Sequence, residues 1–453
     1  MNGAVALPLD LAELSFTASG DSLVRRSVLP SGVRILTEHV PGARSATIGY
    51  WVAVGSRDEQ AGTFGSTHFL EHLLFKGTTT RTALDIAVSF DAVGGEHNAL
   101  TAKEYTCYYA KVRDQDLPMA IDVLADMFVS SLVDPVEFEN ERSVILEELA
   151  MADDDPGDVT SERFFEAVFG GHPLGRPIGG SPESIQAVQR DAVWEHYRAN
   201  YRAQDLVITA AGAVDHDVLV AAVTAALERG GWNLDAPGTP VARRDATADV
   251  IERGSPLVVV HRPIEQANII LGVAGMAASD DRRFTLSVLN SILGGGMSSR
   301  LFQVIREQRG LAYSVYSFTP SYSDAGCVGL YAGCSPSKAG QVTELMLSEF
   351  RKLGSDGVSD DELQRALGQL GGASALALED SDTRMSRLGR SELTQGEFVD
   401  LDEALRRLSL VTRSGIQELA QELASRPLSV AAVGTVDEQT FAGLATMPVT
   451  APQ

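Results

Sequence analysis

The chain has 453 residues, of which 44% are hydrophobic and 22% charged, and its formal net charge is −24. This is the composition of an ordinary globular protein, with a length that suggests two or more domains. The negative charge excludes nucleic acid as a partner, because the phosphate backbone would be repelled. A membrane-spanning helix is excluded too, because such a helix needs an apolar run of about 18 residues and the sequence contains none of that length.

Two features of the sequence indicate a reducing, intracellular location. The first 24 residues contain no Lys or Arg, which argues against a secretory signal and against an Arg-rich organelle presequence. The only cysteines, Cys107, Cys327 and Cys334, are too few for a disulfide framework and are expected to be buried apolar residues. The sequence therefore predicts a cytoplasmic protein with neither a membrane nor a nucleic-acid partner.

Strands and helices follow one another along the first half of the chain. Residues 26–42, with Pro-Ser-Gly at their centre, predict a β-hairpin, and residues 46–54 predict the next strand. We expect helices at 66–76, 81–93, 117–131, 135–151 and 184–199, and a strand at 205–212. This order, without a Gly-rich nucleotide turn, indicates an α+β fold in which helices pack on one face of each largely antiparallel sheet.

The chain also contains two stretches that look like copies of earlier ones. Gly212 and Gly434 each follow an apolar run and precede Val-Asp, at an offset of 434 − 212 = 222 residues. The strand with Ala46 resembles the segment with Ala267, at an offset of 267 − 46 = 221. Similar offsets at such distant points indicate an internal duplication of about half the chain.

The predicted domains follow from this duplication. Residues 233–256 are rich in Pro, Gly and charged residues, which is typical of a linker. We therefore expect an N-terminal domain at 1–232, which contains the histidine motif described next, a linker at 233–256, and a homologous C-terminal domain at 257–453.

The candidate catalytic site lies in residues 67–77, which read THFLEHLLFKG. On a helix, His68, Glu71 and His72 lie on one side, so the two imidazoles can hold one Zn²⁺ with Glu71 beside it. Ser66 or Thr67 is expected to cap the helix. The alternative is a pair of core histidines satisfied by hydrogen bonds, but the order H-x-x-E-H is a metallopeptidase signature.

A catalytic zinc site needs a third protein ligand, and residues 139–151 offer four carboxylates. Glu141 and Glu148 are seven residues apart and share a helix face, while Glu147 points about 100° away. If the shared face lies toward the metal, Glu148 is the ligand and Glu141 supports it. Glu139 is expected to be an ordinary solvated charge, and the residues alone leave Glu147 open.

At this point the sequence resembles the pitrilysin/insulinase family of zinc peptidases, the inverzincins, and within it the branch similar to mitochondrial processing peptidase. The resemblance rests on HFLEHLLFKGT and on the blocks at 94–112, 172–185 and 294–318. In the family a distal Glu, 76 positions after the second His, binds zinc, and 148 − 72 = 76 selects Glu148. The resemblance further implies that Glu71 is the general base and Glu141 a second acid of the site.

The resemblance assigns further roles in both halves. It implies that Arg306 and Tyr313 lie near the developing oxyanion. The implied substrate-binding residues lie on an edge strand and in a mobile Gly-rich loop: Asn98, Ala99, Leu100, Thr101, Gly294, Gly295 and Gly296. The loop is not a phosphate loop, because Met297-Ser298-Ser299 stands where G-K-[ST] would be needed. The second half lacks H-x-x-E-H, so we expect one zinc ion per chain.

The expected function is a zinc-dependent endopeptidase that cleaves unfolded peptides or presequence-like segments inside a chamber. By analogy with the family, the chamber forms in a homodimer, in which Tyr313 acts on the partner's zinc domain. One alternative is a non-catalytic scaffold subunit like the respiratory-complex core proteins, which tend to lose zinc ligands. Another is the catalytic subunit of a heterodimer.

Overall fold

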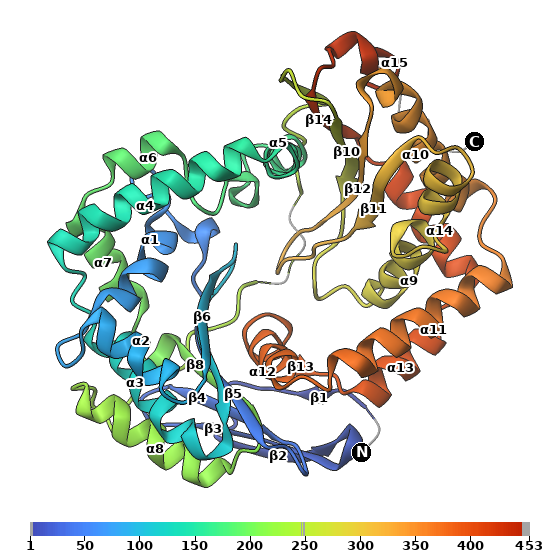
Figure 1. Cartoon of the computed structure of the whole chain (residues 1–453). Helices are drawn as coiled ribbons and strands as arrows, with labels where there is room; N and C mark the ends of the chain where they lie inside the picture. Colours follow the sequence, from blue (N-terminus) through green and yellow to red (C-terminus); the bar gives the residue numbers. More distant parts are fainter. Residues whose placement is uncertain (1–2, 246, 248–249, 446–453) are drawn as a thin grey trace. The chain divides into compact units, whose positions relative to one another are not determined.

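The computed structural model describes residues 3–245, 247 and 250–445, and they form the expected α+β architecture (Figure 1). The chain divides into two compact units. The first comprises Met1–Leu149, Pro177–Arg243 and Ala375–Glu403, and the second comprises Ala150–Arg176, Arg244–Ser374 and Ala404–Gln453. The division after Arg243 lies inside the segment 233–256, but each unit also includes a segment from the other half of the chain.

The first unit is built on a seven-stranded sheet. In sheet order its strands are β2 (Glu13–Ala18), β3 (Ser22–Val28), β4 (Arg34–His39), β8 (Leu206–Gly212), β5 (Ser45–Val52), β7 (Thr106–Arg113) and β6 (Glu96–Thr101). Only β4 and β8 run parallel among these neighbours. The predicted hairpin is the β3–β4 pair, and the predicted strands at 46–54 and 205–212 are β5 and β8.

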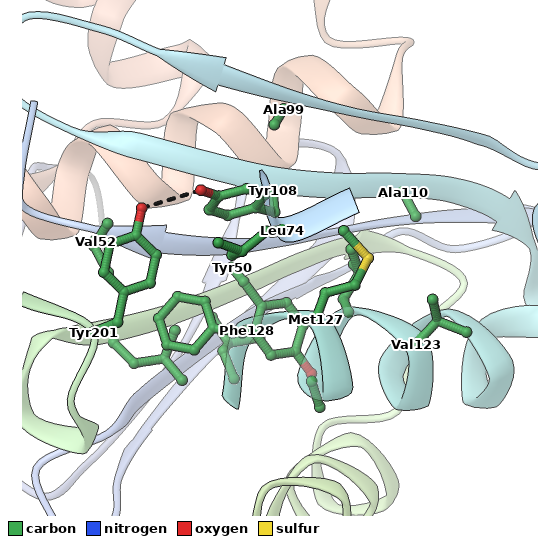
Figure 2. Packing of buried hydrophobic residues seen from close by; sticks show 14 of the residues in the cluster. Tyr50, Val52, Leu74, Ala99, Tyr108, Ala110, Val123, Met127, Phe128 and Tyr201 are labelled. Carbon is green, nitrogen blue, oxygen red and sulfur yellow. Dashed lines mark hydrogen bonds between the residues drawn. The ribbon is translucent and has the colours of Figure 1, made fainter. Parts of the chain in front are cut away.

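Both faces of this sheet are covered, as the alternation along β5 demonstrates. Ile48 and Tyr50 belong to the main core. Figure 2 shows Tyr50 there beside Phe128 of α3 (Leu117–Ser130). Trp51 points the other way and packs with Met385 on α12 (Ser381–Arg390). Successive strand residues point to opposite faces. The sheet therefore has helices on its expected face and one further helix, from the second half of the chain, on the other.

The second unit repeats the arrangement in a five-stranded sheet. In sheet order its strands are β11 (Ala312–Phe318), β12 (Cys327–Cys334), β10 (Ala267–Ala274), β14 (Ser429–Gly434) and β9 (Leu257–His261). The internal pairs predicted from the sequence coincide with β5/β10 and β8/β14, and β14 is parallel to β9 as β8 is to β4. The duplication therefore extends to strand order and direction.

The second unit in turn receives a helix from the first half of the chain. Helix α5 (Pro156–Phe169) places Phe164 and Val168 against Ile270 and Ala431 of the second sheet. Each half thus contributes one helix to the other half's sheet, so contiguous ranges do not describe the compact units.

The other helices of the first unit are α1 (Ser66–Leu73), α2 (Ala83–Asp91), α4 (Pro135–Asp154, whose last turn belongs to the second unit), α6 (Pro182–Ala187), α7 (Arg190–Asn200) and α8 (His216–Arg229). The expected helix at 66–76 is α1 followed by a 3₁₀ turn at Leu74–Lys76. The expected single helix at 184–199 is wrong. It is split into α6 and α7, because Val188 adopts an extended backbone between them.

The second unit contains α9 (Arg283–Gly294), α10 (Ala339–Ser355), α11 (Asp360–Ala377), α13 (Leu401–Ser409), α14 (Arg413–Ala424) and α15 (Ala442–Ala445), with the ends of α11 and α13 in the first unit. Two short strands of the first unit, β1 (Val5–Ala6) and β13 (Glu397–Phe398), pair separately. Among the described residues, we find no helix that combines the length and the apolar composition of a membrane span.

All three cysteines are buried, as the sequence predicts, and none forms a disulfide in the described part of the chain. Burial raises the pKa of the Cys107 thiol well above its ordinary value and that of Cys334 to about 11. The thiols are therefore protonated near neutral pH, and we assign them a packing role.

One buried carboxylate, which lies just after α12 in the chain, pairs with arginines on two strands of the first unit's sheet. Glu392 lies 3.3 Å from Arg26 Nη1, 3.3 Å from Arg34 Nη1 and 3.2 Å from Arg243 Nη2, and the side chains of Glu392, Arg26 and Arg34 are almost fully buried. Removing one partner of a buried ion cluster leaves uncompensated charge in a medium that solvates it poorly.

Replacing Glu392 by Ala should therefore lower the free energy of unfolding of the first unit by about 3–5 kcal/mol. All three tryptophans of the chain (Trp51, Trp194 and Trp232) belong to this unit, so their fluorescence during urea unfolding reports on it alone. Glu379→Ala removes an exposed carboxylate from the same unit and is the matched control. Equal unfolding midpoints for the two variants would contradict the prediction.

Candidate metal centre

Helix α1 has an apolar side that anchors it and a polar side that carries the candidate ligands. Phe69, Leu70 and Leu73 are buried, and the Phe69 ring stacks on Phe138 of α4 with 4.4 Å between centroids. Gly65 precedes the helix with φ +91°, and a Cβ there would collide with the Ile185 side chain. A glycine is therefore required at the point where the chain turns into the helix.

Three side chains converge at one point beside α1. His68 Nε2 and His72 Nε2 are 3.3 Å apart, and Glu148 Oε2 lies 3.3 Å from His72 Nε2 and 3.7 Å from His68 Nε2. In tetrahedral zinc coordination, ligand atoms about 2.0–2.1 Å from the metal are about 3.3–3.4 Å apart. The two nitrogens and one carboxylate oxygen therefore fit a zinc ion, and they leave one position for water.

The glutamates of α4 differ clearly in their position relative to the two histidines. Glu148 joins the two histidines in the only group of three or more potential ligands found among the described residues. Glu147 is exposed, and Glu139 is paired with Arg142 at 3.0 Å on the surface. The structure thus brings together the ligand set expected from the sequence.

Glu141 supports the site from behind His72. Its Oε2 accepts a hydrogen bond from His72 Nδ1 at 2.9 Å, and its Oε1 pairs with Lys76 Nζ at 2.7 Å, while the residue is only 3% exposed. A carboxylate on Nδ1 fixes the ring orientation and directs the Nε2 lone pair to the metal position. Lys76 was not predicted from the sequence, although it lies in the same motif.

The electrostatics of His68 suit a metal ligand. Burial, with a smaller contribution from His72, lowers the pKa of His68 below its usual range, against the opposing effect of Glu71 and Glu148. The neutral imidazole is the form that binds metals. Glu71 is half-buried on the same side of α1, outside the group of three converging ligand atoms.

The expected helix cap is wrong. Neither Ser66 nor Thr67 caps α1; Thr67 Oγ1 instead contacts His196 Nε2 at 3.2 Å. The backbone N–H groups of Gly65 and Thr67 instead bind the carboxylate of Glu59, which lies within the preceding loop. No short-range sequence pattern signals such a cap, because the usual signal lies within three residues of the helix start.

The strand with Asn98, Ala99, Leu100 and Thr101 lies at the edge of the sheet. Within the part of the chain that the structure describes, this strand, β6, pairs with β7 alone, and it packs beside α1 and α2. Leu100 is 49% exposed, while Ala99 and Thr101 are buried. An edge strand offers unpaired main-chain groups to an extended peptide.

The remaining predicted site residues belong to the second unit. Arg306 Nη1 donates to the Tyr313 carbonyl oxygen at 2.8 Å, and its guanidinium lies 4.5 Å from the centroid of the Tyr313 ring, which is 76% exposed. The structure therefore brings this pair together. A phenol and a guanidinium next to each other can donate to developing negative charge.

The Gly-rich segment begins at Gly294, the last residue of α9, and the side chain of Gln369 binds it through hydrogen bonds. Gln369 Nε2 donates to the Gly295 carbonyl oxygen at 2.9 Å, and Gln369 Oε1 accepts from Ser291 at 3.2 Å. A Cβ on Gly296 would approach the Gln369 amide to 2.6 Å, so a larger residue would displace this contact.

The chain matches known proteins over most of its length. A family model described as Insulinase (Peptidase family M16) matches residues 34–181, and one described as Peptidase M16 inactive domain matches residues 187–370. An uncharacterised zinc protease of Streptomyces coelicolor is 47% identical over 420 residues, which cover 93% of this chain and 91% of that protein. The zinc protease YmxG of Bacillus subtilis, also uncharacterised, is 37% identical, with coverages of 91% and 98%.

Solved structures share the fold at lower identity. A protease from Helicobacter pylori superimposes with a TM-score of 0.80 at 21% identity, covering 92% of this chain and all of that one. A chain of Complex III2 from Candida albicans gives a TM-score of 0.77 at 21% identity, with coverages of 90% and 95%. The first family model covers His68, His72 and Glu148. The second covers strands β9 to β12 of the duplicated half, where the sequence has no H-x-x-E-H motif.

Proposed function

Because the chain belongs to the insulinase (M16) family of peptidases, we propose that it is a zinc-dependent endopeptidase that cleaves unfolded peptides or presequence-like segments inside a chamber. The observation that carries this proposal is the convergence of His68, His72 and Glu148 within 4.8 Å of one another. The names of the relatives as zinc proteases support zinc as the metal.

The site residues of the first unit have distinct roles in the proposed reaction. When bound, zinc polarises the scissile carbonyl and lowers the pKa of its water toward about 7. Glu71 accepts a proton from the attacking water and delivers it to the leaving amine. Glu141 and Lys76 keep His72 oriented, and β6 captures the substrate as an added strand.

The second unit contributes substrate contacts and oxyanion stabilisation. Tyr313, held by Arg306, donates to the developing oxyanion, and Gly294, Gly295 and Gly296 contact the peptide. The proposed active form is a cytoplasmic homodimer that encloses the chamber, with one zinc ion per chain and Tyr313 acting in the partner's site.

The principal rival is a non-catalytic scaffold, because a Complex III chain has the same fold. The convergence of His68, His72 and Glu148, with Glu71 on the same side of α1, favours the peptidase. A scaffold has no need for two imidazoles turned toward a carboxylate with a second carboxylate behind them.

Metal removal tests the proposal directly. Treatment with 1,10-phenanthroline should abolish cleavage of an unstructured peptide library, and added Zn²⁺ should restore it. The products, identified by mass spectrometry, should arise from internal cleavage. Folded, zinc-loaded protein that cleaves no member of the library would favour the scaffold.

A further inference from the structure

The first turn of α1 needs external support, because it carries a metal ligand. The helix begins at Ser66, and His68 lies only two residues later. Backbone N–H groups at the start of a helix have no partner within the helix, so this turn frays unless other groups bind them. Any movement of the turn displaces the His68 imidazole from the point where the three ligand atoms converge.

Glu59 provides this support from the loop of residues 55–65. Its Oε2 accepts from the Gly65 backbone N–H at 2.8 Å and its Oε1 from the Thr67 backbone N–H at 2.7 Å. The residue is 3% exposed. Its negative charge also lies at the positive end of the helix dipole. One buried carboxylate therefore binds two donors that flank the start of the helix.

The same loop is fastened at its other end to the turn that joins β6 to β7. The backbone N–H groups of Ser56 and Arg57 donate to the carbonyl oxygens of Ala102 and Lys103, at 3.1 and 3.0 Å. Arg57 Nη1 also pairs with Glu104 Oε1 at 2.6 Å, and these side chains are 11% and 4% exposed. The loop thus connects the end of the edge strand to the start of the metal helix through largely buried polar contacts.

We propose that Glu59 is a positioning residue of the metal centre, which holds His68 at a fixed place relative to the metal and to the peptide-binding edge of β6. The inference rests on the proposed function for the meaning of that edge, whereas its effect on zinc binding requires only the metal site. Glu59 is not one of the three converging ligand residues, and it would act on the site through the backbone at the start of α1.

The test is Glu59→Gln, which keeps the size of the side chain but turns one of its two acceptors into a donor facing a backbone N–H. The zinc dissociation constant, measured by competition with a chromophoric chelator below the melting temperature, should rise by about 10–100-fold, as for other groups that orient zinc ligands. The visible spectrum of the Co²⁺-loaded variant should change, and kcat should fall more than KM rises. Glu59→Asp, which keeps both oxygens, should recover part of the loss, and it replaces the Gln variant if that one does not fold.

Glu392→Ala is the control for a merely structural effect. It destabilises the same unit without touching α1, so its zinc affinity should stay within about twofold of wild type. A Glu59→Gln protein that melts earlier but has wild-type zinc affinity and an unchanged Co²⁺ spectrum would overturn the inference. Wild-type protein that binds zinc but cleaves no peptide would contradict the proposed function alone, whereas wild-type protein that binds no zinc would overturn both.

Discussion

Replacing Glu71 by Gln is expected to lower kcat by about 10²–10⁴-fold, the usual contribution of a general base, while one zinc ion stays bound. Gln has almost the same shape as Glu but cannot accept a proton near neutral pH. The three converging ligand atoms belong to His68, His72 and Glu148, so the substitution leaves the metal ligands intact. The measurement is kcat on a fluorogenic peptide together with zinc content by atomic absorption.

Glu147→Gln is the matched control, because it removes the same charge from an exposed position on α4 near the site. Its kcat should remain at the wild-type value. If Glu71→Gln also lost its zinc, Glu71 would be a ligand and the general base would have to be sought elsewhere. If the variant kept full activity, the proposed proton transfer would be wrong.

The local part of the site could be predicted from the sequence because it depends on helix periodicity. His68, Glu71 and His72 lie on one side of α1 for the same reason that Phe69, Leu70 and Leu73 are buried. Spacing on α4 likewise places Glu141 and Glu148 on a shared face. The structure adds that both carboxylates meet the same ring, one at each nitrogen of His72.

The choice of Glu148 over Glu147 needed more than periodicity. Both helix faces are polar, and the sequence alone does not say which one lies toward α1. The spacing known for the family selected Glu148. The physical reason is the stack of Phe69 on Phe138, which fixes how α4 is rotated about its axis relative to α1.

Features that depend on tertiary contacts were missed. Glu59 reaches the start of α1 only because the loop folds back, so no local pattern marks it. The exchanged helices α5 and α12 were missed for a similar reason. An amphipathic helix indicates that it has a buried face, but not which sheet it covers. The apolar pattern of 184–199 also gives no sign that Val188 adopts an extended backbone, which separates α6 from α7.

Replacing Glu148 by Ala should weaken zinc binding by more than about 100-fold, because even groups that only orient the ligands contribute about 10–100-fold. The substitution removes the only carboxylate from the converging set and leaves two imidazoles, too few for a catalytic zinc site with three protein ligands. Glu148 is the most exposed of the three, so its loss should change the fold little. Its effect therefore separates metal binding from stability.

The clearest readout is the rise in melting temperature with added Zn²⁺, since a metal that binds only the folded state stabilises it in proportion to the logarithm of its concentration. The wild type and Glu147→Ala should show the same rise, whereas Glu148→Ala should show almost none at micromolar Zn²⁺. Peptidase activity should be lost in parallel and return only at far higher zinc concentrations. If Glu147→Ala lost the zinc-dependent rise and Glu148→Ala kept it, the third ligand would lie on the other face of α4, and the geometry at His72 would have to change on metal binding.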